Sequence, residues 1–123
     1  MSTFKPGLVG ATICLCLSHA HAESRTVADA RSEVCARTAE HWFDQEYGGE
    51  RFGVKLQHHY NRKGKVCYAL VTHRRGCEQL FDINDPSHPR EEAIYCGQLC
   101  RVKETKCTTE SEWEGLVRPY LEQ

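Results

Sequence analysis

Hydrophobic and polar positions follow a helical period in the first patterned segment of the chain. Residues 26–46 contain neither Gly nor Pro, and their apolar side chains recur at steps of three and four residues. This spacing places them on one side of an α-helix, and Cys35 lies on that side. The Gly48-Gly49 pair that follows is typical of a helix end, because glycine accepts the left-handed conformation without a Cβ penalty.

The next segment changes to an extended pattern. Residues 54–60 and 65–73 flank the sequence Asn61-Arg62-Lys63-Gly64, whose Asn and Gly are turn-forming residues. The sequence therefore predicts a β-hairpin. Residues 66–71 are almost continuously apolar, and we expect them to form a central strand.

Two further extended segments follow a break at Arg74-Arg75-Gly76. A third strand is predicted over residues 77–83. Two prolines within residues 84–89 exclude a helix or a ladder strand there, so a loop is expected. A fourth extended segment is predicted over residues 93–102, interrupted at Gly97.

The last segment has the clearest local signal for a helix. Thr109 precedes Glu112 by three residues, which is the spacing of a capping box. The apolar residues that follow are spaced as one helical face: Trp113, Leu116, Val117, Tyr120 and Leu121. Because proline lacks a backbone N–H, we expect Pro119 to kink or loosen the final turn.

Length and element order together predict the fold class. The chain has 123 residues, of which 40% are hydrophobic and 27% charged, so it is long enough for one packed domain and too short for two. The predicted fold is α+β, with an N-terminal helix, a three- to four-stranded antiparallel sheet and a C-terminal helix. Both helices are expected on one face of the sheet.

The first 22 residues have the three parts of a secretory signal peptide. Lys5 supplies the positive end, residues 8–17 the apolar run, and Ala20-His21-Ala22 the small-x-small ending. The apolar run is about half the length that a membrane span needs. Removing residues 1–22 leaves residues 23–123 with a net charge of −2, because Lys5 is lost while all 17 acidic residues remain. We therefore expect a secreted or periplasmic domain that does not stay inserted in a membrane.

Six cysteines remain after the predicted leader: Cys35, Cys67, Cys77, Cys96, Cys100 and Cys107. An even number in a short exported chain predicts three disulfides. A zinc site is not favoured, because residues 23–123 contain no C-x-x-C pair.

Six cysteines allow fifteen pairings, and sequence alone does not choose among them. Three pairs suit the predicted elements: Cys35–Cys67, Cys77–Cys96 and Cys100–Cys107. The first would join the helix to the central strand, the second would bridge two strands, and the third would clamp a short connection. Because their loop closures together contribute on the order of the stability of a whole domain, reduction is expected to loosen or unfold the protein.

Short motifs are spread over most of residues 23–123. They are Cys35, residues 59–63 (HYNRK), Cys67, residues 80–82 (LFD), residues 100–102 (CRV), Cys107, residues 112–113 (EW) and residues 120–122 (YLE). Together they resemble a loosely defined group of small exported bacterial proteins with the pattern C…HYNxK…C…LxD…CxV…CxSxxEF. Thr109 and Trp113 take the places of its Ser and Phe. The resemblance implies export and the Cys35–Cys67 and Cys100–Cys107 disulfides, and it implies no activity.

The chain contains no complete sequence pattern for metal binding or catalysis. His58 and His59 are neighbours on a predicted strand, so their side chains should point to opposite faces and not bind one ion. Residues 82–93 begin like a calcium loop, but Ser87 and Ala93 stand where Gly and Glu are required. Neither G-x-S-x-G nor H-E-x-x-H is present. We expect no cofactor, no metal and no catalytic residue, although a spatial triad leaves no fixed spacing.

Charge gives no support to nucleic-acid binding. The basic groups at residues 62–65 and 73–75 lie at opposite ends of one predicted strand, about 25 Å apart at about 3.3 Å per residue. They do not form one dense patch, and the net charge is negative. Solvated turn charges explain them.

The sequence favours a non-enzymatic module that binds an unknown protein, such as an inhibitor or an immunity factor. The expected interaction loops contain Asn61, Arg62, Lys63, Asn84, Asp85, His88 and Arg90. One alternative is a small secreted hydrolase or toxin that uses His58, His59 or His73 as a base. Another alternative is a structural protein of the cell envelope.

Overall fold

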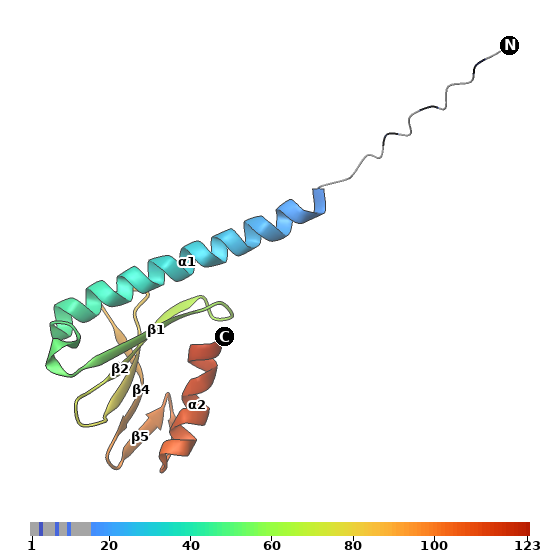
Figure 1. The fold of residues 1–123 in the computed structure, drawn as a ribbon. Helices are drawn as coiled ribbons and strands as arrows, with labels where there is room; N and C mark the ends of the chain where they lie inside the picture. Colours follow the sequence, from blue (N-terminus) through green and yellow to red (C-terminus); the bar gives the residue numbers. More distant parts are fainter. Residues whose placement is uncertain (1–2, 4–6, 8–9, 11–15) are drawn as a thin grey trace.

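The computed structural model describes residues 3, 7, 10 and 16–123. Residues 16–26 are described by their backbone alone. Its elements follow one another (Figure 1) as α1 (Cys16–Tyr47), a short 3₁₀ helix η1 (Glu50–Phe52), β1 (Lys55–Asn61), β2 (Val66–Thr72), β3 (Glu78–Asp82), β4 (Arg90–Cys96), β5 (Leu99–Val102), β6 (Thr105–Lys106) and α2 (Glu110–Glu122). Most of the predicted signal peptide lies outside the described residues. Its last residues, 16–22, form the start of α1.

The six strands form one antiparallel sheet in which each strand pairs with the next along the chain. This arrangement confirms the α+β class, whereas the expected number of three to four strands is wrong. The predicted segment over residues 93–102 is in fact a hairpin of β4 and β5, which turns at Gly97 with a φ of 60°. A second tight turn, which contains Lys103, adds the short strand β6.

The two helices cover opposite faces of the sheet, so the expectation that both lie on one face is wrong. Alternate residues of β2 explain the arrangement, because side chains along a strand point to opposite faces. Ala69 and Val71 pack in the cluster under α1, whereas Tyr68 and Leu70 pack in the cluster under α2. The continuous apolar run that predicted a central strand is the signature of burial on both faces.

Helix α1 contacts the sheet through its C-terminal half. Ala39, Trp42 and Phe43 are buried against β2 and β3, as the three- and four-residue spacing predicts. The helix begins earlier than the predicted residue 26, and its N-terminal part projects beyond the sheet (Figure 1). It ends as expected, because Gly48 takes a φ of 72° and its N–H donates to the carbonyl of Asp44 at 2.9 Å.

Helix α2 begins at the predicted cap. The Thr109 Oγ1 accepts a hydrogen bond from the backbone N–H of Glu112 at 3.1 Å. Trp113 and Val117 are buried against the sheet. The helix continues past Pro119 to Glu122, and the carbonyls of its last turn accept hydrogen bonds from β1.

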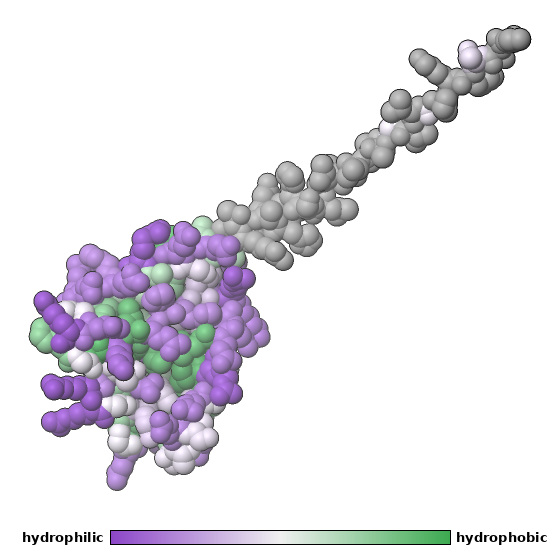
Figure 2. Space-filling model, in the orientation of Figure 1, coloured by the Kyte–Doolittle hydropathy of each residue, from purple (hydrophilic) through white to green (hydrophobic). Residues whose placement is uncertain are grey.

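Three disulfides link these layers: Cys35–Cys67, Cys77–Cys96 and Cys100–Cys107. They are the pairs suited to the predicted elements. The first ties α1 to β2, the second joins the start of β3 to the end of β4, and the third joins β5 to the segment before α2. Hydrophilic side chains enclose smaller apolar areas on the face seen in Figure 2.

Candidate functional site

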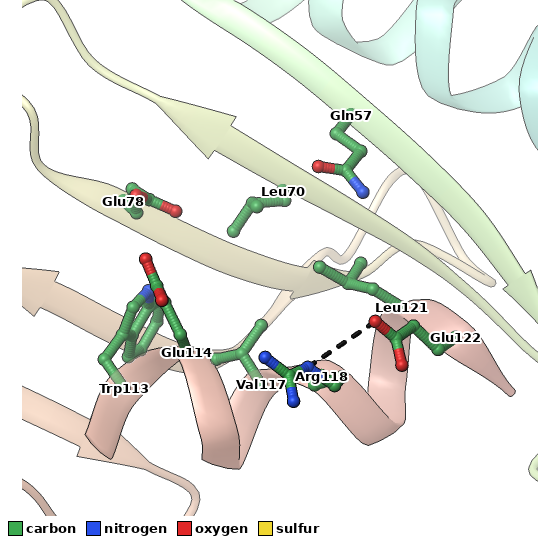
Figure 3. Close-up of a pocket in the computed structure, with 9 residues that line it drawn as sticks. All are labelled: Gln57, Leu70, Glu78, Trp113, Glu114, Val117, Arg118, Leu121 and Glu122. Atoms are coloured by element: carbon green, nitrogen blue, oxygen red, sulfur yellow. Dashed lines mark ion pairs between the residues drawn. The ribbon is translucent and has the colours of Figure 1, made fainter. Parts of the chain in front are cut away.

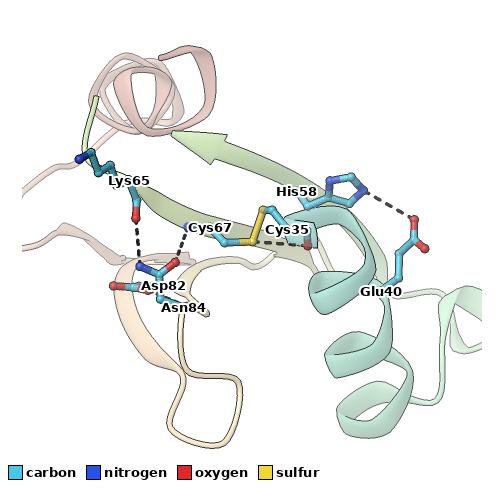
Figure 4. Close-up of a disulfide and its surroundings, with 7 residues drawn as sticks. All are labelled: Cys35, Glu40, His58, Lys65, Cys67, Asp82 and Asn84. Atoms are coloured by element: carbon cyan, nitrogen blue, oxygen red, sulfur yellow. Dashed lines mark hydrogen bonds and ion pairs between the residues drawn. A yellow bond between two sulfur atoms is a disulfide. The ribbon is translucent and has the colours of Figure 1, made fainter. Parts of the chain in front are cut away.

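The two predicted interaction loops meet at one end of the sheet. The Asn84 side chain, from the β3–β4 loop, lies between the β1–β2 turn and the start of β2 (Figure 4). Its Nδ2 donates to the carbonyl of Lys65 at 3.2 Å, and its Oδ1 accepts from the backbone N–H of Cys67 at 2.8 Å. One amide therefore joins two loops that are separated along the chain.

Asn61 fixes the other side of the same turn. Its side chain is buried, its Oδ1 accepts from the Gly64 N–H at 2.8 Å, and its Nδ2 donates to the carbonyls of Pro119 and Tyr120 at 3.1 and 3.3 Å. The turn and the end of α2 are thus held together by one amide group. Asn61 and Asn84 have a structural role that the sequence did not predict.

The β3–β4 loop is also braced internally. The Asp85 carboxylate accepts from the Ser87 N–H at 3.1 Å and lies 3.1 Å from the Nδ1 of His88. Arg90 lies 3.5 Å from Glu92 at the start of β4. These side chains, except that of Glu92, are exposed to solvent.

The exposed charged and histidine side chains of the predicted site, together with the neighbouring Lys65, therefore form one surface with a defined backbone. We call it the two-loop surface, and it consists of Arg62, Lys63, Lys65, Asp85, His88 and Arg90. Basic side chains dominate the turn, and acidic and basic side chains mix in the loop. Such a surface can form ion pairs and hydrogen bonds with another protein.

The three histidines considered as catalytic bases lie in separate places. The His58 Nε2 lies 3.7 Å from a Glu40 carboxylate oxygen on the α1 side. His59 belongs to the opposite face of β1, and the His73 Nε2 lies 2.6 Å from the Oε1 of Gln79. The structure does not bring them together into one site.

His59 has a perturbed titration. Burial lowers the pKa of the His59 imidazole below its usual value, and the neighbouring Arg62 and His58 lower it further. Its Nε2 is buried and has no hydrogen-bond partner among the described residues. The His59 side chain is half-buried, and a lowered pKa disfavours the charged imidazole there, which fits a packing role.

A groove between α2 and the sheet was not predicted from the sequence. It encloses about 230 Å³, and its floor is apolar (Figure 3): Leu70, Trp113, Val117 and Leu121. Polar side chains form its rim: Gln57, Glu78, Glu114, Arg118 and Glu122. The Arg118 Nε lies 3.5 Å from a Glu122 carboxylate oxygen. We call this the α2-side groove.

Glu78 has a perturbed carboxyl group at this groove. Burial raises the pKa of the Glu78 carboxyl above its usual value, and Glu110 and Glu114 raise it further. The nearby Trp113 side chain acts in the opposite direction and lowers this pKa in part. The only sequence signal for this arrangement is the two-residue spacing from Leu80, which puts Glu78 on the face of β3 that α2 covers.

No cluster of three or more His, Cys, Asp or Glu side chains suited to a metal ion occurs in the part of the chain that the structure describes. Within residues 16–123, no helix is long and apolar enough to cross a membrane. No family model, curated protein or solved structure matches the chain.

Proposed function

We propose that this chain is an exported, disulfide-stapled, non-enzymatic protein-binding module of the inhibitor or immunity type. The partner binds at the two-loop surface. One observation carries the proposal: the Asn84 amide bonds to both Lys65 and Cys67, so two loops distant in sequence form one braced surface. Binding through loops that are already ordered loses less conformational entropy than binding through mobile loops.

Export is the part of the proposal that concerns location. Disulfides persist in oxidising compartments, and three of them in one small domain favour a secreted or periplasmic protein. The signal-peptide pattern of residues 1–22 and the resemblance to small exported bacterial proteins favour the same location.

Site-specific photo-crosslinking in the native compartment tests the binding surface. A photoreactive residue is placed at Lys63, at Pro86 or, as a control, at Arg75, which lies in the turn at the opposite end of β2. We expect the first two positions to give the same crosslinked partner and the control to give none. Equal products from all three positions, or no product from the first two, would contradict the proposal.

A matched pair of charge reversals separates this surface from general electrostatics. Arg62→Glu with Lys63→Glu and Arg74→Glu with Arg75→Glu make the same change in net charge at opposite ends of β2. Only the first pair should lose the crosslinked partner. A ladder of self-crosslinked chains would instead indicate the structural envelope protein. Hydrolytic activity that is lost on replacing a single histidine by alanine would indicate the enzyme.

A further inference from the structure

The sheet has two very different edges. The β6 edge is only two residues long. The β1 edge is seven residues long, pairs with β2 at every position from Lys55 to Asn61, and contains neither a proline nor a bulge. Most proteins shorten, bend or cover such an edge, because its unpaired backbone groups attract another strand.

The hydrogen-bond pattern identifies which β1 backbone groups point outward. The Cys67 carbonyl accepts from the Ile83 N–H at 2.9 Å, so the backbone groups of Cys67 face β3. Because these groups alternate in direction along a strand, those of its neighbours Val66 and Tyr68 face β1. The strand register then places the N–H and C=O groups of the alternate β1 residues on the open edge: Leu56, His58 and Tyr60.

The open edge ends where the chain itself uses it. The next outward N–H, that of Arg62, donates to the Gln123 carbonyl at 3.0 Å. The outward backbone groups of Leu56, His58 and Tyr60 have no partner among the described residues. Three residues with one donor and one acceptor each can bind one extended peptide.

Grooves lie on both faces of this edge, because α1 and α2 flank β1 (Figure 3). The α2-side groove includes Gln57, from the middle of β1. A second groove, of about 330 Å³, lies on the opposite face, and we call it the α1-side groove. It is lined by Glu40, Phe43, Asp44, Glu50, Leu56 and His58.

Both grooves combine apolar surface with an excess of negative charge. The α1-side groove has three carboxylates and neither Lys nor Arg. The α2-side groove also has three carboxylates, and its one arginine lies beside Glu122. Lysine and arginine suit such grooves, because their aliphatic stems cover apolar surface while their charged ends meet carboxylates.

We propose that the β1 edge binds, by strand addition, an extended segment of another protein that contains two adjacent basic residues. Neighbouring residues of a strand point to opposite faces, so one basic side chain enters the α1-side groove and the next enters the α2-side groove. Main-chain hydrogen bonds to Leu56, His58 and Tyr60 hold the segment. This site is separate from the two-loop surface and does not depend on it.

Charge selects this occupant over a second copy of the chain. Two β1 edges paired with each other would bring the carboxylate-rich grooves of both copies together. Repulsion between like charges opposes that assembly and favours a basic segment.

Amide hydrogen exchange with a synthetic peptide tests the proposal. The probe has about nine residues, the length of a long strand, with a central Lys-Arg pair between β-branched residues. Added to the oxidised full chain, it should slow exchange at the amides of Leu56, His58 and Tyr60. Alternate N-methylation of the peptide edge that faces β1 should abolish this protection, and N-methylation of its other edge should not.

Variants of the protein test the two parts of the site separately. His58→Pro removes an outward N–H without removing a bond to β2 and should weaken peptide binding about tenfold. Two double variants remove carboxylates from one groove at a time: Glu40→Gln with Asp44→Asn, and Glu114→Gln with Glu122→Gln. We expect peptide binding to weaken about twofold to fivefold for each carboxylate removed. Glu104→Gln, in the turn before β6, should leave it unchanged.

Three results would overturn the proposal. The first is binding of the Lys-Arg peptide without slower exchange at Leu56, His58 and Tyr60. The second is equal binding of a control peptide with Glu-Glu in place of Lys-Arg. The third is slow exchange of these amides that depends on protein concentration without peptide, which would assign the edge to a second copy of the chain.

Discussion

The two helices cover opposite faces of one sheet, but they are held there in different ways. Helix α1 is joined to β2 by the Cys35–Cys67 disulfide, close to the buried Ala39, Trp42 and Phe43. Helix α2 has no covalent bond to the sheet along its own length. It is held by packing of Trp113 and Val117, and by hydrogen bonds from the Asn61 side chain of β1 to the carbonyls of its last turn.

The stability of the two faces therefore depends on different interactions. The α1 face depends on the oxidised state of one cysteine pair, because a crosslink limits the conformations that the unfolded chain can adopt. The α2 face depends on close packing and on satisfied polar groups, which act in the folded state. Loss of the crosslink should therefore destabilise α1 more than α2, and loss of packing under α2 should destabilise α2 more than α1.

Reduction of all three disulfides should have the largest effect. Chain-entropy estimates for closures of 32, 19 and 7 residues are about 3.7, 3.2 and 2.4 kcal/mol, and together they are comparable with the whole stability of a small domain. We expect the thermal midpoint, measured by circular dichroism, to fall steeply or the transition to be lost. An unchanged midpoint in reductant would contradict this expectation.

Trp113→Ala should be the most damaging single substitution on the α2 face. The side chain is almost fully buried between α2 and the sheet, so its loss should lower the free energy of unfolding by about 3 to 5 kcal/mol in urea denaturation. Two milder variants form a matched pair. Trp113→Phe also removes an indole group that lowers the pKa of the Glu78 carboxyl, whereas Trp42→Phe removes an indole N–H that has no partner among the described residues. Trp113→Phe should therefore lower the free energy of unfolding more than Trp42→Phe does.

Removing the Cys35–Cys67 crosslink tests the difference between the faces directly. The double variant Cys35→Ala with Cys67→Ala should lose about 3.7 kcal/mol of stability. It should also speed amide hydrogen exchange in α1 more than in α2. As a control, Cys77→Ala with Cys96→Ala opens a link within the sheet and should not distinguish the helices. Equal acceleration in both helices by the first variant would show that the two faces open together.

Local patterns predicted much of this fold. The hairpin was predicted at residues 54–60 and 65–73, within one residue of β1 and β2 at each end. The Thr109 cap and the three cysteine pairs were also predicted. The β4–β5 hairpin was missed, because one glycine in an extended run fits both a bulge and a turn. The choice between them at Gly97 depends on strand pairing, which the local sequence does not contain.

The candidate site was predicted in part for a similar reason. Turn-forming residues located each loop, but the contact between Asn84 and Lys65 spans 19 residues along the chain and has no local signature. The grooves beside β1 were missed altogether. They depend on which face of the sheet each helix covers, and on acidic residues such as Glu78 that a sequence presents as ordinary strand positions.

Asn61→Ala should have an intermediate effect, confined at first to the end of α2. It leaves the carbonyls of Pro119 and Tyr120 and the N–H of Gly64 without their partner, at a cost of about 1 to 3 kcal/mol. Hydrogen exchange should become faster in the last turn of α2. Asn61→Asp provides the control, because it keeps an acceptor for Gly64 but has no donor for the two carbonyls. If both variants leave the last turn unchanged, packing alone holds it.

Glu78→Gln should give the smallest effect, and its sign depends on pH. The pKa of Glu78 is raised in the folded protein, mainly because burial disfavours the charged form. Its contribution to stability is therefore fully present below the unfolded pKa and is lost as the pH rises through the folded pKa. A neutral amide removes this loss, so Glu78→Gln should gain stability relative to the wild type between pH 4 and pH 7. Urea denaturation at both pH values measures that gain, and a constant difference would show that the carboxyl is not desolvated by α2.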